Sequence, residues 1–441
     1  MINGDQVKVV KFGGSSLSEA EQFRKVKKII ISDKARKYVI PSAPGKRFGD
    51  DTKVTDMLIN CFKNASDSDY INVFNSIRER YFSIINDLSL TVNLDEDFRE
   101  IEENLKKGSS IDYMASRGEY LNGKLLANYL GFDFVDAAEV VFFDGDGQYD
   151  QKKTNSVMSK VLSEHKYAVI PGFYGSMPDG KIKTFSRGGS DITGAIVSGA
   201  VKADLYENWT DVSGFLMCDP RIVKDPKPIK KITYRELREL SYMGATVLHE
   251  DSIFPVKNAG IPINIKNTNS PEDSGTLIVP YSDNDKNNDI ITGIAGKKGF
   301  SVLHIEKDMM NQEVGFGMKV LKVLYDFNIG FEHFPSGIDT MSIIINKSDM
   351  DGREKDIIRK VSEAVNPDHI SVQTGLSLIA VVGRNMINTP GTASRVFSSI
   401  AKNNVNIRMI DQGSSELNII IGVDEKDFNT AIKAIYNEFC S

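Results

Sequence analysis

An internal repeat in the last third of the chain restricts the fold more than any other feature of the sequence. The segment Gly299–Ile305 (GFSVLHI) aligns with Gly375–Val381 (GLSLIAV), 76 residues further along the chain. The same spacing relates four further pairs: Gly315 and Gly391, Val320 and Val396, Asn328 and Asn404, and Met341–Ile345 and Leu417–Ile421. One ungapped spacing over such a length predicts two copies of a single structural unit.

Each copy is patterned as strand, helix, strand, strand and helix, and its last strand would come from an adjacent segment. This is the ferredoxin-like βαββαβ pattern. The stretch 281–289 before the repeat is polar and rich in turn-forming residues, which is typical of a linker. We therefore expect three domains, at 1–282, 290–365 and 366–441, and we allow for strands interleaved between the last two.

The first 280 residues alternate short β-branched runs with helical periodicity, which indicates a mainly parallel sheet covered by helices. The expected strands are Val7–Phe12, Tyr38–Pro41, Val140–Phe143, Ala168–Pro171 and Leu205–Trp209. Ser18–Glu21 (SEAE) matches a capping box that opens a helix. The polar stretch 62–112 reads as a helical insertion. The fold class predicted for the whole chain is α/β, with two small βαββαβ domains after the sheet.

Length and composition exclude several classes of protein. The 441 residues suggest about three domains of roughly 150 residues each. The net charge of −6 argues against binding along a nucleic-acid backbone. No stretch approaches the ~20 apolar residues of a membrane span, so we expect a cytoplasmic protein without a membrane partner. The three cysteines, at 61, 218 and 440, are too dispersed for a disulfide framework or a CxxC site, and the five histidines are scattered.

The first motif with chemical potential is Lys11–Ser16 (KFGGSS), which follows the first expected strand. Glycines at Gly13 and Gly14 let the backbone approach a phosphate closely, and Lys11 adds a point charge. The spacing is not that of a P-loop. A glycine pair after a strand also occurs as a plain tight turn, and the motif alone does not separate these interpretations.

The second motif is Ser186–Thr193 (SRGGSDIT), at the start of a predicted helix. Arg187 followed by Gly188, Gly189 and Ser190 suits capture of a carboxylate by a guanidinium and backbone N–H groups. Asp191 could orient a lysine or a metal ion. Helix capping explains the serine and the acid equally well, but it leaves Arg187 and both glycines unexplained.

Two further motifs complete the set. Trp209–Gly214 (WTDVSG) and Cys218–Arg221 (CDPR) follow the last expected strand, at the sheet edge where open α/β folds bind ligands. Ser116–Glu119 (SRGE) places an acid beside an arginine, which is most often a surface pair.

Together and in this order, these motifs resemble the aspartokinase branch of the amino-acid kinase family, and the resemblance covers nearly the whole chain. Glu239–His249 (ELSYMGATVLH) belongs to the same signature. The repeat resembles the paired ACT domains of these enzymes, which bind free amino acids as feedback effectors. The resemblance implies transfer of the ATP γ-phosphoryl group to the β-carboxylate of L-aspartate, the first step towards lysine, threonine and methionine. Since the chain ends after the repeat, a monofunctional enzyme without a homoserine dehydrogenase is expected.

The resemblance also implies a role for individual residues. Lys11 and Asp191 match the catalytic pair, and the expected cofactors are ATP and Mg²⁺, with the metal arriving with ATP rather than held by a side-chain cluster. The matching aspartate-binding residues are Thr55, Glu119, Arg187, Gly188, Gly189 and Ser190. The matching ATP-binding residues are Lys11, Gly13, Gly14, Ser15, Thr210, Asp211 and Arg221. The segment Pro44–Lys53 is longer than the family's usual glycine turn.

Regulation is expected in the first repeat, where Met318, Glu332, Ser336 and Asp339 are candidate effector residues. The acids favour an effector with an extra ammonium group, so lysine is preferred to threonine. A homodimer or a dimer of dimers through the ACT domains is the expected assembly. Two alternatives stay open: a kinase for another amino acid such as glutamate, and an amino-acid or nucleotide sensor with weak or no catalysis.

Overall fold

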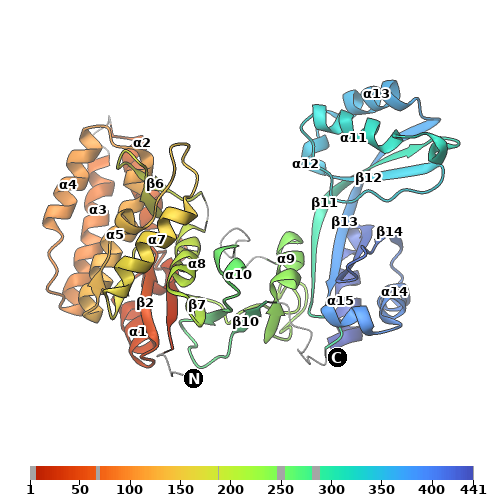
Figure 1. Cartoon of the computed structure of the whole chain (residues 1–441). Coiled ribbons are helices and arrows are strands. Elements are labelled where there is room, and N and C mark those ends of the chain that lie inside the picture. The colour runs from red at the N-terminus through yellow and green to blue at the C-terminus, as the bar shows by residue number, and fades with distance from the viewer. Residues whose placement is uncertain (1–5, 66–69, 187, 246–253, 281–288, 441) are drawn as a thin grey trace. The chain divides into compact units, whose positions relative to one another are not determined.

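The computed structural model describes residues 6–65, 70–186, 188–245, 254–280 and 289–440. The chain forms two compact units (Figure 1). The first unit comprises Met1–Phe215, Pro228–Tyr234 and Val247–Asp283, and the second comprises Leu216–Lys227, Arg235–Thr246 and Asn284–Ser441. Two short segments from the first region of the chain thus pack with the repeat. The domain limits expected from the sequence stay a prediction.

An eight-stranded sheet forms the centre of the first unit. Its order is β3-β4-β2-β1-β7-β9-β10-β8, and all neighbours are parallel except β9 and β10. The strands are β1 (Lys8–Phe12), β2 (Arg36–Pro41), β3 (Asp133–Phe134), β4 (Ala168–Val169), β7 (Leu205–Thr210), β8 (Lys231–Thr233), β9 (Ile263–Asn267) and β10 (Thr276–Val279). Because β1 is central and parallel to both neighbours, the residues that follow it lie at the carboxyl edge of the sheet.

Helices flank this sheet, as the sequence pattern predicts. They are α1 (Ala20–Ile31), α2 (Val54–Lys63), α3 (Tyr70–Leu88), α4 (Asp95–Lys106), α5 (Ile111–Leu130), α6 (Ala137–Val140), α7 (Gln151–Ser163), α8 (Gly189–Val201) and α10 (Phe254–Ala259), with a hairpin of β5 (Tyr174–Ser176) and β6 (Ile182–Thr184). The expected helical insertion is the layer of α3 and α4 against α5 and α2. Its apolar side chains, among them Phe74, Tyr81 and Phe98, belong to one core with β1 and α1.

The second unit is built on a five-stranded antiparallel sheet of order β12-β11-β13-β15-β14. The strands are β11 (Gly293–Glu306), β12 (Thr340–Asn346), β13 (His369–Val382), β14 (Ile407–Asp411) and β15 (Asn418–Asp424). The helices are α11 (Phe316–Asp326), α12 (Lys347–Met350), α13 (Glu354–Val365), α14 (Thr392–Lys402) and α15 (Phe428–Cys440). The two long strands β11 and β13 run through both repeats (Figure 1).

Each half of the long strands serves a different repeat. Residues 300–306 of β11 pair with β12, whereas residues 293–297 pair with residues 378–382 of β13, which continue to β15. The strand ahead of the first repeat therefore completes the sheet of the second. The two copies of the predicted repeat also share backbone conformation at equivalent residues. Gly315 and Gly391 both cap their helices with positive φ, at 81° and 86°, and Asn328 and Asn404 both adopt φ near 60°.

Helix α9 (Tyr234–Tyr242) lies in the chain between two segments of the first unit, but it packs on the second-repeat end of the five-stranded sheet. The buried carboxylate of Glu236 accepts hydrogen bonds from the Thr292 hydroxyl at 2.5 Å and from the Arg384 backbone N–H at 3.0 Å. Glu239 accepts from the amide of Asn418 at 2.6 Å. These contacts fix the helix within the second unit.

Two local expectations are wrong. Val140–Phe143 is not a strand, because the Asp136 carboxylate accepts a hydrogen bond from the Ala138 N–H and caps the short helix α6. Phe142 and Phe143 form only isolated bridges. The capping box at Ser18 is also absent, since Glu19 is the N-cap of α1 and the Ser18 hydroxyl donates to the Ser15 carbonyl instead. Among the described residues, no helix is long and apolar enough to cross a bilayer.

Candidate active site

Lys11 and Asp191 meet at the carboxyl edge of the large sheet. The Lys11 Nζ lies 2.6 Å from the Asp191 Oδ1, and both side chains are largely buried. Asp191 stands in the first turn of α8, and the amide of Asn208, the β7 residue opposite Lys11, donates to the same oxygen at 2.8 Å. The predicted catalytic pair is therefore an ion pair held by a third side chain, which the sequence motifs did not single out.

The glycine turn after β1 packs tightly against the segment after β2. A Cβ on Gly14 would lie 2.8 Å from the Ala43 carbonyl oxygen, and the Gly45 N–H donates to the Gly14 carbonyl at 2.8 Å. Gly14 is thus required by backbone packing whether or not a phosphate binds. Gly13 is less crowded: a Cβ there would lie 3.7 Å from the Lys11 Nζ. The turn, with Ser15 in its 3-10 segment Gly14–Leu17, lies directly beside Lys11.

Glu119 is buried in the middle of α5 and is only partly satisfied. Burial raises the pKa of its carboxyl to about 8, although the backbone N–H of Ala43 and the positive charges of Arg117 and Lys11 oppose the shift. Among the described residues, its Oε2 has no hydrogen-bond partner. An ionised carboxylate with an oxygen that accepts no hydrogen bond is costly to bury, so the neutral form is favoured until a cationic or N–H group binds at Oε2. The ammonium group of an amino acid fits this requirement.

The surface pair first considered for Arg117 and Glu119 is not found, because both side chains are buried. The Arg117 guanidinium instead packs on the rings of Tyr113, Tyr120 and Tyr174, at 4.5 to 5.2 Å from their centroids. Arg117 therefore adds a positive charge to the surroundings of Glu119 from within the core.

The start of α8 is packed against the segment after β4. Gly188 is the N-cap with φ of 60°, and a Cβ on Gly189 would lie 2.4 Å from the Phe173 ring. Ser190 is buried against Gly172, where a Cβ would lie 2.6 Å from the serine side chain. Gly189 is thus explained by close approach, and Gly188 is explained by its positive φ. Arg187 lies outside the described residues, so its proposed role stays a prediction.

Helices α2 and α5 pack together at the residues that precede Thr55 and Glu119. A Cβ on Gly118 would lie 2.8 Å from the Ala43 Cβ and 3.5 Å from a Val54 methyl group. Gly118 therefore allows the two helices to touch at the residues that precede Glu119 and Thr55. Thr55 is half-buried in the first turn of α2.

The predicted ATP residues divide between the two units. Thr210 ends β7, where the neighbouring Trp209 carbonyl accepts from the Gly13 N–H at 2.9 Å, and the Thr210 hydroxyl donates to Asp211 at 3.1 Å. Arg221 belongs to the second unit, where it pairs with Asp219 at 2.6 Å and stays exposed.

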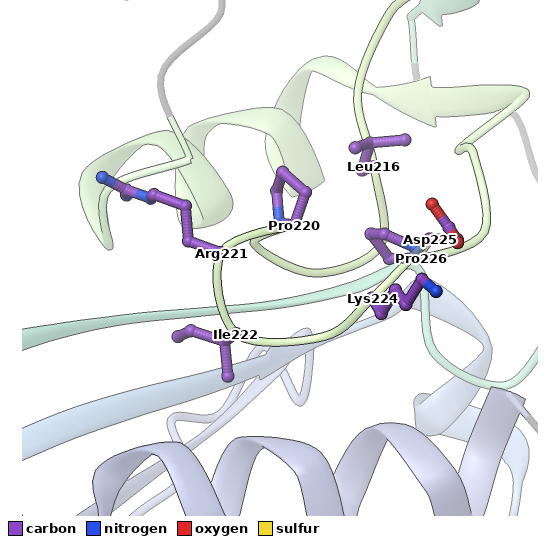
Figure 2. Close-up of a pocket in the computed structure, with 7 residues that line it drawn as sticks. All are labelled: Leu216, Pro220, Arg221, Ile222, Lys224, Asp225 and Pro226. Atoms are coloured by element: carbon purple, nitrogen blue, oxygen red, sulfur yellow. The ribbon is translucent and has the colours of Figure 1, made fainter.

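Arg221 also lines an open pocket of about 530 Å³ (Figure 2). The other lining residues are Leu216, Pro220, Ile222, Lys224, Asp225 and Pro226. Figure 2 shows the Arg221 side chain extending away from the Lys224 and Asp225 side of this loop. All the residues that line this pocket belong to the second unit.

The candidate effector residues lie on the first repeat. Glu332 is half-buried and accepts hydrogen bonds from the Tyr242 hydroxyl of α9 at 2.5 Å and from the Asn346 amide at 3.3 Å. Asp339 accepts from the Met309 backbone N–H at 2.9 Å, which holds the loop before α11. Ser336 bridges to β12, and Met318 on α11 is 70% exposed.

Comparison with known proteins places these features in a family. Residues 6–267 match the sequence model of the amino acid kinase family, and residues 379–439 match an ACT domain. Aspartokinase 3 of Bacillus subtilis is 40% identical over 98% of this chain and 98% of its own length.

Two solved structures extend the comparison. The structure of Clostridium acetobutylicum aspartate kinase superimposes with a TM-score of 0.93 at 53% identity, and it covers 98% of this chain and 100% of that chain. Escherichia coli aspartokinase III, solved with aspartate and ADP, has the same fold at a TM-score of 0.74 and 23% identity, over 99% and 100% of the two chains.

Proposed function

Because this chain belongs to the amino acid kinase family, as an aspartate kinase with an ACT regulatory region, we propose that Lys11, Glu119 and Asp191 form the centre of its active site. The enzyme transfers the γ-phosphoryl group of ATP to the β-carboxylate of L-aspartate. A carboxylate is already a nucleophile at neutral pH and needs little help from a base. Catalysis therefore consists of positioning and of neutralising charge along the path of the phosphoryl group.

Lys11 supplies that charge. Its ammonium group is held at 2.6 Å by Asp191 beside the glycine turn, where phosphate oxygens can approach Gly13 closely. Gly14, Ser15, Thr210 and Asp211 complete the proposed nucleotide contacts within the first unit, and the contact expected for Arg221 stays a prediction. Asp191 keeps Lys11 oriented, and the amide of Asn208 keeps Asp191 oriented.

Aspartate binds between α5 and the start of α8 in this proposal. The unpartnered Oε2 of Glu119 receives the α-ammonium group, and Arg187 receives a carboxylate together with backbone N–H groups of Gly188, Gly189 and Ser190. Thr55 contacts the substrate from α2. The single observation that carries the assignment is the buried Glu119 oxygen that lacks a donor.

Mg²⁺ is proposed to enter with ATP. Among the described residues, no group of three or more histidine, cysteine, aspartate or glutamate side chains is arranged to hold a metal ion. Mg²⁺ usually keeps several waters and binds substrate phosphates plus one or two carboxylates. We propose Asp191 as a carboxylate that binds this ion. The bound ion would neutralise phosphate charge.

The substrate assignment is tested by ATP-dependent formation of the acyl hydroxamate with aspartate and with glutamate. We expect turnover with aspartate, and an aspartate KM raised at least about 10-fold in Glu119→Gln, because the amide removes the charge opposite the ammonium group. Equal turnover of glutamate, or an unchanged KM for aspartate in Glu119→Gln, would contradict the proposal.

We propose that lysine rather than threonine is the effector. Glu332 is a half-buried acid on the first repeat, and the position 76 residues later is Arg408. At this position, therefore, only the first repeat offers an acid that can bind an ammonium group. Inhibition by lysine at concentrations that leave threonine without effect supports this choice, and the reverse order contradicts it. The cytoplasmic location stays a prediction.

We also propose that copies of the chain associate through the first repeat. Val314, Met318, Tyr325 and Ile338 are 69 to 96% exposed there. The residues 76 positions later are Pro390, Ser394, Ala401 and Ser414, which are small or polar, or a proline. Large exposed apolar groups of this kind mark an interaction surface. Tyr325→Asp should lower the sedimentation coefficient, whereas Ala401→Asp should not. Unchanged assembly in Tyr325→Asp would contradict the proposal.

A further inference from the structure

Arg80 is a buried arginine that none of the sequence motifs includes. It lies on α3 and is 6% exposed. Its guanidinium donates to the carbonyl oxygens of Thr52 at 3.1 Å, Ser18 at 3.4 Å and Gly45, and it pairs with Asp51 at 3.4 Å. One side chain on the helical layer thus contacts the segment after the glycine turn and both ends of the long loop after β2.

The loop 46–52 has few other attachments. Its remaining hydrogen bonds are internal: the Lys46 ammonium donates to the Gly49 carbonyl, and Arg47 donates three times to Asp51. Phe48 is 61% exposed. Within the described residues, Arg80 makes every hydrogen bond that ties this loop to another part of the chain.

The loop leads directly into the proposed aspartate site. Thr55 follows Thr52 by three residues, and Gly45 is bonded to Gly14 of the glycine turn at 2.8 Å. The neighbour of Arg80 on α3, Tyr81, donates its hydroxyl to the Gly118 carbonyl at 2.7 Å, one residue before Glu119. Two consecutive residues of α3 therefore hold the two chain segments that carry Thr55 and Glu119.

We propose that Arg80 is a positioning residue for aspartate. It fixes the loop 46–52 so that Thr55 and Glu119 face one substrate molecule. The inference rests on the proposed function of those two residues. An arginine suits this position because its planar guanidinium donates in several directions at once, whereas a lysine offers a single ammonium group. The helical insertion that supplies Arg80 thereby contributes to substrate binding without touching the substrate.

Steady-state kinetics of Arg80→Lys and Arg80→Met test the proposal, with Arg78→Met as a control on the same helix. Arg78 also pairs with an acid, Asp95 at 2.5 Å, but it is exposed and its partner lies outside the loop. We expect the aspartate KM to rise about 10- to 100-fold in both Arg80 variants, because small displacements of positioning groups have effects of this size. The ATP KM should change less than about 3-fold, and Arg78→Met should behave as the wild type.

A second readout follows the loop itself. Trypsin should cut the folded Arg80 variants after Lys46 or Arg47 at least about 10-fold faster than the wild type, because the loop loses its attachment. If Arg80→Met does not fold, Arg80→Lys and Asp51→Asn decide, with an expected rise in aspartate KM of about 3-fold for Asp51→Asn. An aspartate KM equal to that of Arg78→Met, or a fall in thermal stability without a change in KM or cleavage, would overturn the proposal.

Thr55→Ala and Glu119→Gln distinguish this inference from the function on which it rests. If both raise the aspartate KM and the Arg80 variants do not, only the role of Arg80 fails. If neither raises it, the proposed aspartate site fails, whatever the Arg80 variants do.

Discussion

The two ends of the same central strands carry two different kinds of charged cluster. Near the amino ends, Arg36 binds Glu207 with two nitrogens at 2.8 and 3.3 Å, and Lys8 lies 2.8 Å from Asp33. The Trp209 indole also donates to Glu207, at 2.9 Å. This amino-end cluster is closed, since its acids all have donors within the fold.

The carboxyl-end cluster is incomplete. Lys11 and Asp191 are paired, but Glu119 keeps a buried oxygen without a donor among the described residues. The charges of the amino-end cluster stabilise the fold, whereas we expect those of the carboxyl-end cluster to bind a ligand. A closed buried pair specifies how strands associate, whereas an open one is completed by substrate.

The largest effect is expected at Asp191. Asp191→Asn removes the negative charge that orients Lys11 and leaves an amide facing the amide of Asn208. We expect kcat to fall about 10²-fold or more, because Lys11 no longer holds its position on the phosphoryl path. Steady-state hydroxamate formation measures this change. A kcat within about 3-fold of the wild type would remove Asp191 from the catalytic pair.

A substitution in the amino-end cluster should lower the free energy of unfolding. Arg36→Met leaves Glu207 buried with the Trp209 indole and the more distant Lys8 as its donors, so the free energy of unfolding should fall by about 3 kcal/mol. Urea denaturation gives this value. The folded fraction should keep its specific activity to within about 3-fold. A stable Arg36→Met protein with a large loss of kcat would indicate an active site near the amino ends of the strands and would contradict the proposal.

The third prediction uses the pH dependence of Glu119. With a carboxyl pKa of about 8, aspartate binding should weaken as pH falls below 8, because the neutral carboxyl cannot pair with the ammonium group. The profile of kcat/KM for aspartate should rise towards pH 8 in the wild type, and Glu119→Gln should lack this limb. A rising limb that survives in Glu119→Gln would assign it to another group.

The same carboxyl makes a stability prediction of defined sign. The folded protein holds this proton up to about pH 8, whereas the unfolded chain releases it near 4.5. The unfolded state therefore binds fewer protons between these values, and the free energy of unfolding falls as pH rises from 4.5 to 8. Glu119→Gln should flatten this slope. An identical slope in the variant would mean that Glu119 is ionised in the free enzyme.

The smallest effect concerns Glu332, which is half-buried, has donors and lies on the first repeat. Glu332→Gln should raise the lysine concentration for half-maximal inhibition by about 5-fold, as expected for one charge-assisted contact. Glu354→Gln, an exposed acid in the first turn of α13, is the control. Equal lysine sensitivity in both variants would exclude Glu332 from the effector site.

Sequence patterns predicted the elements that depend on local chemistry. The repeat was predicted from apolar runs, glycines and asparagines that recur at one spacing, and Gly315, Gly391, Asn328 and Asn404 have the matching positive φ values. The resemblance to aspartokinases implied that Lys11 and Asp191 form a pair, and their side chains lie 2.6 Å apart.

The sequence analysis failed where it missed a local helix cap and where the partners of a side chain lie far away in the chain. The apolar run Val140–Phe143 predicts a strand, but the Asp136 cap directs Ala137–Val140 into a helix. Arg80 carries no local signal, since it lies within a polar helix and finds its partners 28 to 62 residues away in the chain. The pairing of Asn208 with Asp191 likewise becomes visible only when β1 and β7 are neighbours.

Lys8 and Lys11 provide the most direct test, because they stand on the same strand and each lies within 2.8 Å of an aspartate. Lys8→Met and Lys11→Met are compared in one assay of ATP- and aspartate-dependent hydroxamate formation, together with thermal unfolding. We predict that Lys11→Met loses at least about 10²-fold in kcat with little change in the melting temperature, whereas Lys8→Met keeps its kcat. Equal losses of kcat in the two variants, or a loss confined to Lys8→Met, would contradict an active site at the carboxyl edge.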